Sequence, residues 1–89
     1  MQEQHIIESI RRLMIGHNIV DNDALVLTSN SRLIDELGLD SISMLELVTA
    51  IEEEFDITID FEELDIEVLN LASSFASLIG RKVAEREAA

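Results

Sequence analysis

At Leu37-Gly38-Leu39-Asp40-Ser41-Ile42, the chain passes from a long polar loop into its strongest helical segment. Glycine relaxes the backbone there, a short acid stands where a helix would begin, and a serine follows on the first turn. One interpretation is an ordinary helix start, in which Asp40 accepts hydrogen bonds from free N–H groups. A serine at this place can also be a substrate, because the positive end of a helix favours an attached phosphodiester. The flanking segments bear on this choice.

The segment from Ser41 to Phe55 is the clearest helix, since it has no Gly or Pro and consists mostly of good helix formers. At 100° per residue its core face is one stripe, made of Met44, Leu47, Val48, Ile51 and Phe55. A second face carries Ile42, Leu45, Glu46, Thr49, Glu52 and Glu53. Two apolar residues framed by carboxylates favour a docking surface, although an ordinary solvated face accounts for the same pattern. Acids at a helix C-terminus oppose the dipole, and a basic partner would explain them.

The segments on either side predict three more helices. A first helix from about Gln2 to Ile15 should stop at Gly16, with Arg11 and Arg12 facing away from the core. The connection from Asn18 to Asp40 is long and carries many aliphatic residues, so it must lie over the core.

After the central helix, Asp56 to Asp60 predicts an extended connector that buries Ile57 and Ile59. A capping box of Asp60 and Glu63 should open a short third helix carrying Phe61 and Leu64. Asn70 should cap the last helix, whose inner face holds Leu71, Phe75, Leu78 and Ile79. The predicted fold is all-α: a small four-helix bundle of three longer helices and one short third helix. Residues 1–89 are expected to form a single domain.

Composition narrows the class of function. Apolar residues make up 47% of the chain and aromatic residues only 3%, which predicts an aliphatic core. The absence of Cys removes disulfides, thiolate metal sites and Cys nucleophiles, and a cytoplasmic location fits it most simply. A net charge of −13 repels nucleic acids and anionic membranes and attracts basic protein surfaces. Motifs of catalysis and of metal binding are missing, so we expect a protein that is not an enzyme and holds no metal. We also expect it to be a monomer.

The quoted stretch, with Leu45-Glu46-Leu47-Val48 and Ile51-Glu52-Glu53-Glu54-Phe55 behind it, resembles the acyl carrier protein family. The resemblance covers essentially the whole chain. It implies that a magnesium-dependent phosphopantetheinyl transferase attaches 4′-phosphopantetheine from coenzyme A to Ser41. The terminal thiol would then hold a substrate as a thioester. Asp40, Gly38 and Leu39 would belong to the attachment site, and the second helix face defined above would meet partner enzymes.

Three departures from the family's fatty-acid carriers alter the docking face or the third helix, and they argue against the usual fatty-acid partner enzymes. Ser43 replaces an acid that many of them have, Thr49 stands where they often have Met, and Asp60 stands where they have Pro. The run from Phe55 to Asn70 is more similar to discrete carriers of amino acids, such as the D-alanyl carrier of cell-wall modification and stand-alone aminoacyl or peptidyl carriers.

This finer resemblance implies loading by an adenylating enzyme and delivery to acyltransferase or synthase modules. The setting would be polyketide or nonribosomal-type secondary metabolism, such as antibiotic biosynthesis. Two alternatives remain at this stage. One is a general acyl carrier of fatty-acid or polyketide synthesis, and the other is an acidic helical adaptor whose Ser41 is never modified.

Overall fold

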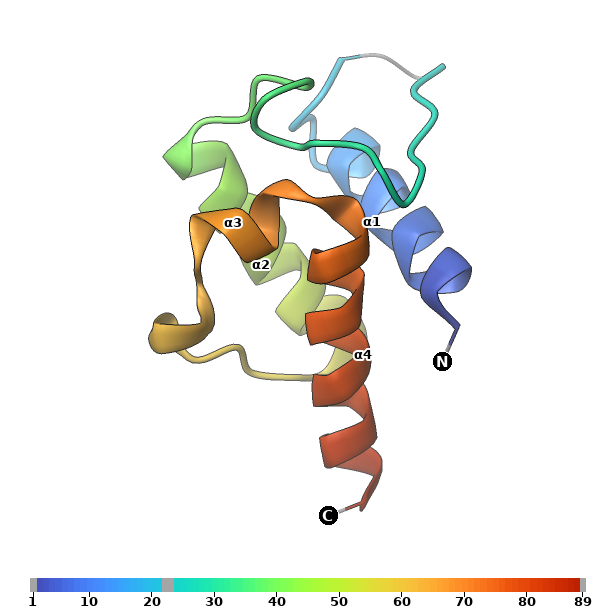
Figure 1. Ribbon diagram of the computed structural model, residues 1–89, viewed down its shortest axis with the longest axis vertical. Helices are drawn as coiled ribbons and strands as arrows, with labels where there is room; N and C mark the ends of the chain where they lie inside the picture. The colour runs from blue at the N-terminus through green and yellow to red at the C-terminus, as the bar shows by residue number, and fades with distance from the viewer. Residues whose placement is uncertain (1, 22–23, 89) are drawn as a thin grey trace.

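The computed structural model describes residues 2–21 and 24–88, and the regular elements of this part of the chain are all helical, as predicted (Figure 1). Within this part of the chain the helices are α1 (Glu3–Gly16), α2 (Ser41–Phe55), α3 (Ile66–Asn70) and α4 (Ala72–Ala88). A 3₁₀ turn, η1 (Phe61–Glu63), precedes α3. Three longer helices, one short helix and a long loop between α1 and α2 confirm the predicted fold class.

The core is aliphatic and lies where the three longer helices meet. α1 packs against both α4 and α2, and α3 packs against α4. The predicted core stripe of α2 is confirmed, because all five of its side chains are buried. The largest side chains with almost no exposure come from α1, α2, α4 and the loop, and they are Phe75, Ile6, Ile10, Met14, Leu33, Leu47, Ile51 and Ile79. Burial of this kind is the main stabilising contribution in so small a protein.

The long loop lies over the core, as its aliphatic residues predicted. Leu25, Leu33 and Leu39 are buried in the same cluster as the helices. Arg11 extends from α1 and donates from Nε to the Leu25 carbonyl oxygen at 2.6 Å. Its side chain therefore holds the loop, besides pointing away from the core.

α1 ends at Gly16, as predicted, but the residue that turns the chain differs. Gly16 is the last residue of the helix, and Asn18 takes the left-handed conformation, with φ of 57°. Asn is one of the few residues besides glycine that adopt this conformation readily, so it turns the chain as the glycine was expected to do.

The predicted third helix is divided into η1 and α3. One arm of the capping box is present, since Glu63 Oε1 accepts from the Asp60 N–H at 3.1 Å. Glu63 also pairs with Lys82 at 2.6 Å and with Arg81 at 3.1 Å, which joins η1 to α4. The hydrogen bond from Lys82 lowers the pKa of Glu63. The side chain of Phe61 lies outside what the structure describes.

Asn70 does not cap α4; that prediction was wrong. It is the last residue of α3, and α4 begins at Ala72. Its side-chain oxygen accepts from the Ile34 N–H at 2.8 Å and from the Asp35 N–H at 3.2 Å. A distant part of the chain thus takes the acceptor that a helix cap would have used.

Over the described residues, no helix combines the length and the apolar character that crossing a membrane requires. The same part of the chain contains no group of three or more His, Asp or Glu side chains placed to hold a metal ion.

Candidate functional site

The start of α2 is capped as the simple interpretation predicted. Asp40 has an extended backbone, with φ of −91° and ψ of −179°, and its Oδ1 accepts from the Ser43 N–H at 2.8 Å. This hydrogen bond from the Ser43 backbone holds the pKa of Asp40 below its ordinary value. Asp40 therefore has a structural role that is independent of any ligand.

Ser41 is the first residue of α2, and its side chain is exposed. Among the residues that the structure describes, its hydroxyl has no hydrogen-bond partner. The neighbouring carboxylate of Asp40 is engaged with the helix and has a lowered pKa, which makes it a poor base. Ser41 is thus suited to be modified by another protein's catalytic groups and unsuited to activate itself. Exposure and the adjacent helix N–H groups fit an attached phosphodiester.

The residues just before Asp40 hold this helix start in place. Gly38 has a φ of +74°, a conformation that side chains with a Cβ adopt only under strain. Leu39 is buried, and its N–H donates to the Leu33 carbonyl oxygen at 3.2 Å. Gly38 turns the chain, Leu39 anchors it in the core, and the serine is left at the surface.

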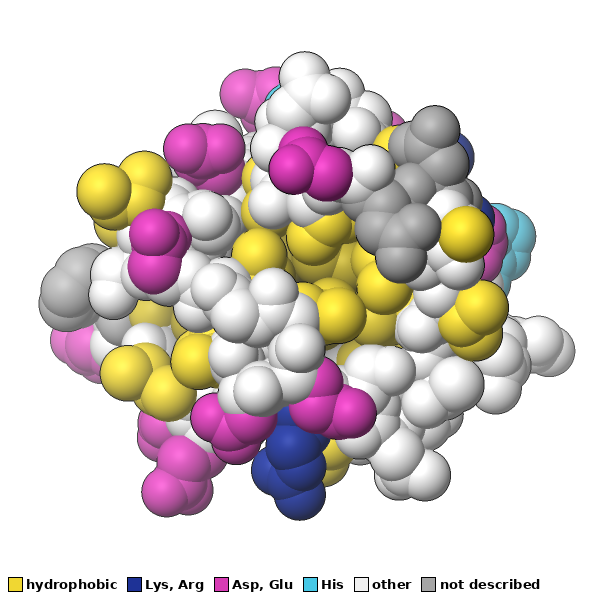
Figure 2. Space-filling view, turned by 90° about the horizontal axis from the view of Figure 1, so that it is seen from above, with side chains coloured by type: hydrophobic (Ala, Val, Ile, Leu, Met, Phe, Trp, Pro, Cys, Tyr) yellow, Lys and Arg dark blue, Asp and Glu magenta, His cyan; other side chains and the backbone are white. Residues whose placement is uncertain are grey.

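An apolar cleft of about 480 Å³ opens beside Ser41, between α2 and α3. Its lining is aliphatic except for the two residues of the helix start, and it consists of Ile34, Leu39, Asp40, Ser41, Met44, Leu45, Val48, Leu64, Ile66 and Leu69. Figure 2, which looks onto the end of the molecule that holds the loop, shows hydrophobic side chains in a hollow with acidic side chains around it. A group attached to Ser41 would have this cleft within reach.

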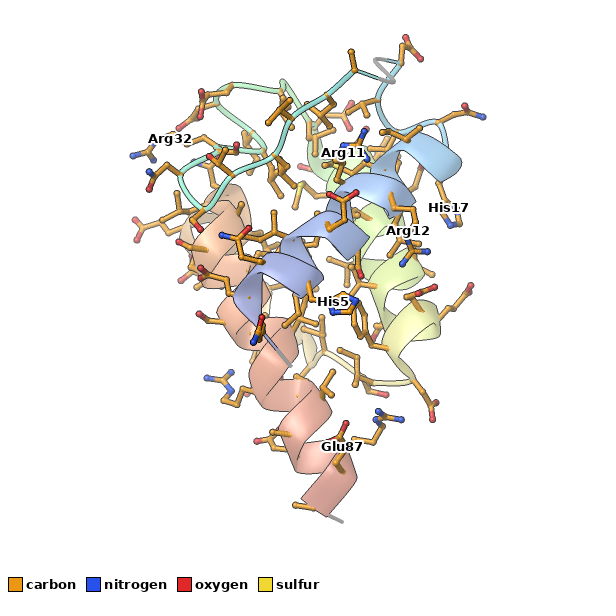
Figure 3. The ribbon with its side chains drawn as sticks, turned by 90° about the vertical axis from the view of Figure 1, so that its right-hand side faces the viewer. His5, Arg11, Arg12, His17, Arg32 and Glu87 are labelled. Carbon is orange, nitrogen blue, oxygen red and sulfur yellow. The ribbon has the colours of Figure 1, made fainter. Side chains whose placement is uncertain are left out.

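The predicted docking residues of α2 come together on one face, with Glu52 as the exception described below. Ile42 is 69% exposed and Leu45 is 55% exposed, which is high for such side chains. A shallow hollow of about 450 Å³ is lined by His17, Ile42, Leu45, Glu46, Thr49, Ala50 and Glu53, and we call it the acidic hollow. His17 reaches it from the end of α1 (Figure 3).

Two of the three glutamates at the end of α2 have partners within the protein. Glu52 is half-buried, and its Oε2 accepts from the Ile59 N–H at 2.9 Å, which fixes the connector after α2. Glu54 pairs with Arg12 of α1 at 3.1 Å. Of these three acids at the C-terminal end of α2, only Glu53 is therefore left to be explained by a basic partner from outside the protein. A docking role for Glu52 stays a prediction, beside this internal contact.

Sequence reasoning missed Ile66 and His17 as parts of this surface. Ile66 is 67% exposed and lines the cleft across from α2. The sequence did contain a signal for Ile66, because a short acid, Asp65, stands directly before it, as Asp40 stands before Ser41. In the structure Asp65 caps α3 by accepting a hydrogen bond from the Glu67 N–H. His17 carried no such signal, since only the packing of α1 against α2 brings it to the acidic hollow.

The lowered pKa of Asp40 leads to a pH prediction. A carboxylate whose folded pKa is below its ordinary value of 3.8 stabilises the fold above that pH, and this contribution is lost as the pH falls through the lowered pKa. In Asp40→Asn the amide oxygen still caps the helix but does not titrate there. The wild type should therefore lose more stability than this variant between pH 5 and pH 3, measured by urea unfolding.

The matched control is Glu53→Gln, which also removes one negative charge from an exposed position on α2. It should lose stability on acidification as the wild type does. Equal acid responses of Asp40→Asn and the wild type would contradict the prediction.

Comparisons with known proteins place these features in context. A family model described as "Phosphopantetheine attachment site" matches residues 18–81. An acyl carrier protein of Caulobacter vibrioides (strain NA1000 / CB15N) is 46% identical over 54 residues, which cover 61% of this chain and 67% of that protein. An acyl carrier protein of Akkermansia muciniphila is 35% identical over 65 residues, which cover 73% of this chain and 79% of that protein. The residues matched by the family model include the start of α2, the whole lining of the cleft, and the acidic hollow except for His17.

Proposed function

The chain belongs to the acyl carrier protein family, a group of non-catalytic carriers with a phosphopantetheine attachment site, and we propose that Ser41 is its attachment residue. The observation that carries this proposal is the hydroxyl of Ser41, which lacks a hydrogen-bond partner within residues 2–21 and 24–88 and is exposed at a helix start beside an apolar cleft. Ser74, by contrast, donates its hydroxyl to the Val68 carbonyl oxygen at 2.6 Å. Ser77 is exposed, but it lies within α4 and not at a helix start.

In the proposed transfer of phosphopantetheine, this chain contributes only the hydroxyl oxygen that is modified. In the transfer, Ser41 Oγ forms a bond to the phosphorus that carries the pantetheine of coenzyme A, while the bond from that phosphorus to the nucleotide breaks. The serine proton leaves to a base of the transferase, because Asp40 is held by the Ser43 N–H. The positive end of α2 then favours the new negative charge. When attached, the group supplies a terminal thiol that holds the cargo as a thioester.

The proposal is tested by incubating the protein with coenzyme A, magnesium and a promiscuous phosphopantetheinyl transferase. We expect the intact mass to rise by one phosphopantetheine, and peptide mapping to place it on Ser41. No gain under conditions that modify a control carrier would support the acidic adaptor instead.

For the cargo, we propose an amino acid or a related acyl group, loaded by an adenylating enzyme in secondary metabolism of the polyketide or nonribosomal type. The run from Phe55 to Asn70, which is more similar to discrete carriers of amino acids, supports this proposal, and Ser43, Thr49 and Asp60 depart from the pattern of fatty-acid carriers. Thr49 lies in the acidic hollow, and Ser43 lies two residues after the attachment residue in the first turn of α2, so both are placed to influence the choice of partner.

A second candidate is a carrier of fatty-acid or polyketide intermediates. Two observations favour it: the aliphatic walls of the cleft, and the relatives named acyl carrier proteins. The modified protein can be offered to a set of adenylating enzymes and to a malonyl transferase in parallel. Aminoacyl loading supports the first candidate, whereas efficient malonyl loading without any aminoacyl loading supports the second.

The acidic hollow leads to a prediction about partner enzymes. If Glu46 and Glu53 attract basic surfaces, Glu46→Lys and Glu53→Lys should each slow association with the transferase, and added salt should weaken binding of the wild type. Glu87→Lys is the control with the same change of charge, because Glu87 lies near the far end of α4 (Figure 3). Association rates can be measured by stopped-flow fluorescence. Equal association rates for all three variants would show that Glu46 and Glu53 are ordinary solvated residues with no role in attracting partners.

A further inference from the structure

Asn70 joins the end of α3 to the loop that leads to Ser41. Its side-chain oxygen accepts from the N–H groups of Ile34 and Asp35, and its Nδ2 donates to Asp35 Oδ2 at 3.0 Å. Its backbone oxygen accepts from the Leu33 N–H at 2.6 Å. One residue therefore makes four hydrogen bonds to three consecutive loop residues. Figure 1 shows this part of the loop lying against the junction of α3 and α4.

The loop segment held by Asn70 leads without interruption to the attachment residue. The N–H groups of Glu36 and Leu37 donate to the Arg32 carbonyl oxygen, and the Gly38 N–H donates to the Ile34 carbonyl oxygen at 3.0 Å. Together with the bond between Leu39 and Leu33, these contacts close residues 32–39 into one turn, which we call the presenting turn. Asp40 and Ser41 follow it directly. A shift of the presenting turn would therefore displace the start of α2.

Resting on the proposed attachment at Ser41, we propose that Asn70 is a positioning residue for that modification. It holds the presenting turn on the α3–α4 junction and so fixes the place at which the transferase meets the serine. It also ties together two walls of the apolar cleft, since Ile34 lies on the loop side and Leu69 on the α3 side. Group transfer is sensitive to displacements of about 1 Å, so loss of this connection should reduce the rate of modification.

The pairing with Asp35 allows a reciprocal test. In Asn70→Asp, the new carboxylate can still accept from the two N–H groups, but it faces the Asp35 carboxylate and has no proton to donate. In the double variant Asn70→Asp/Asp35→Asn, the amide introduced at position 35 can donate to the carboxylate introduced at position 70. The hydrogen bonds are thereby restored with the donor and acceptor exchanged.

The measurement is kcat/KM for phosphopantetheine transfer to the carrier, followed by intact mass at a temperature where circular dichroism shows each variant to be folded. We expect Asn70→Asp to lower kcat/KM by about ten- to a hundredfold. The double variant should recover most of this loss. A purely structural role would lower the unfolding temperature of Asn70→Asp and leave kcat/KM of the folded protein unchanged.

The outcomes separate this inference from the function on which it rests. If the wild type gains no phosphopantetheine, the attachment proposal fails. If the wild type is modified and folded Asn70→Asp is modified equally fast, or if the double variant recovers nothing, the positioning role is overturned. Should Asn70→Asp be unfolded at the assay temperature, Asn70→Ser replaces it as a neutral side chain that can accept only part of the hydrogen bonds, with a wild-type rate again overturning the role.

Discussion

Ser41→Ala is expected to abolish the gain of phosphopantetheine completely, whereas Ser43→Ala should still be modified. The variant at position 41 lacks the oxygen that would bond to phosphorus, and no nearby group offers a replacement. Ser43 is the closest other serine, but it lies further along the first turn of α2 and is only partly exposed. Its N–H is committed to the cap made by Asp40. Both variants replace a serine by an alanine, at positions two residues apart, so they form a matched pair.

The measurement is the intact mass of each variant after incubation with coenzyme A and the transferase. Urea unfolding of the unmodified proteins serves as the control for folding, and it should show little change for Ser41→Ala, because that side chain is exposed and has no hydrogen-bond partner among the described residues. Modification of Ser41→Ala would contradict the assignment. Modification of neither serine variant, with the wild type modified, would point to a general disturbance of the helix start.

The start of α2 could be predicted from the sequence because its signals are local. A short acid before a helix former, and apolar residues repeated at helical spacing, determine where this helix begins and which side is buried. The structure begins α2 at Ser41 and buries the predicted stripe. The same local logic located one arm of the capping box between Asp60 and Glu63.

The features that could not be predicted depend on contacts between a helix and parts of the chain outside it. Asn70 has the right chemistry for a helix cap, yet its oxygen is used by Ile34 and Asp35, which lie far away in sequence. Glu52 and Glu54 oppose the helix dipole when α2 is considered alone, and only the folded structure supplies the Ile59 N–H and Arg12. In both cases the deciding contact lies outside the helix, and the local preference of a few tenths of a kcal/mol to about 1 kcal/mol is small enough for one such contact to offset it.

Leu45 and Leu47 allow the two faces of α2 to be compared by the same substitution. Leu47 is 0% exposed, and Leu45 is 55% exposed. Leu47→Ala should lower the free energy of unfolding by about 2–5 kcal/mol, because it removes buried methyl groups and leaves a cavity. That is a large part of the roughly 5–15 kcal/mol that stabilises a typical domain. Leu45→Ala should change the free energy of unfolding by only about 0.5 kcal/mol or less.

For partner binding the order should be reversed. Leu45 borders both the apolar cleft and the acidic hollow, so its truncation removes apolar area from the surface that the transferase is proposed to contact. We expect Leu45→Ala to raise KM for the carrier in phosphopantetheine transfer, while folded Leu47→Ala keeps a KM close to that of the wild type. Urea unfolding and transferase kinetics give the free energy of unfolding and the KM of each of the two variants.

An unchanged KM in Leu45→Ala would show that this leucine does not belong to the docking surface. A loss of stability as large as that of Leu47→Ala would mean that α2 presents a different face to solvent than the structure shows. Because both variants delete the same atoms from one helix, any difference between them reports on the direction each side chain faces.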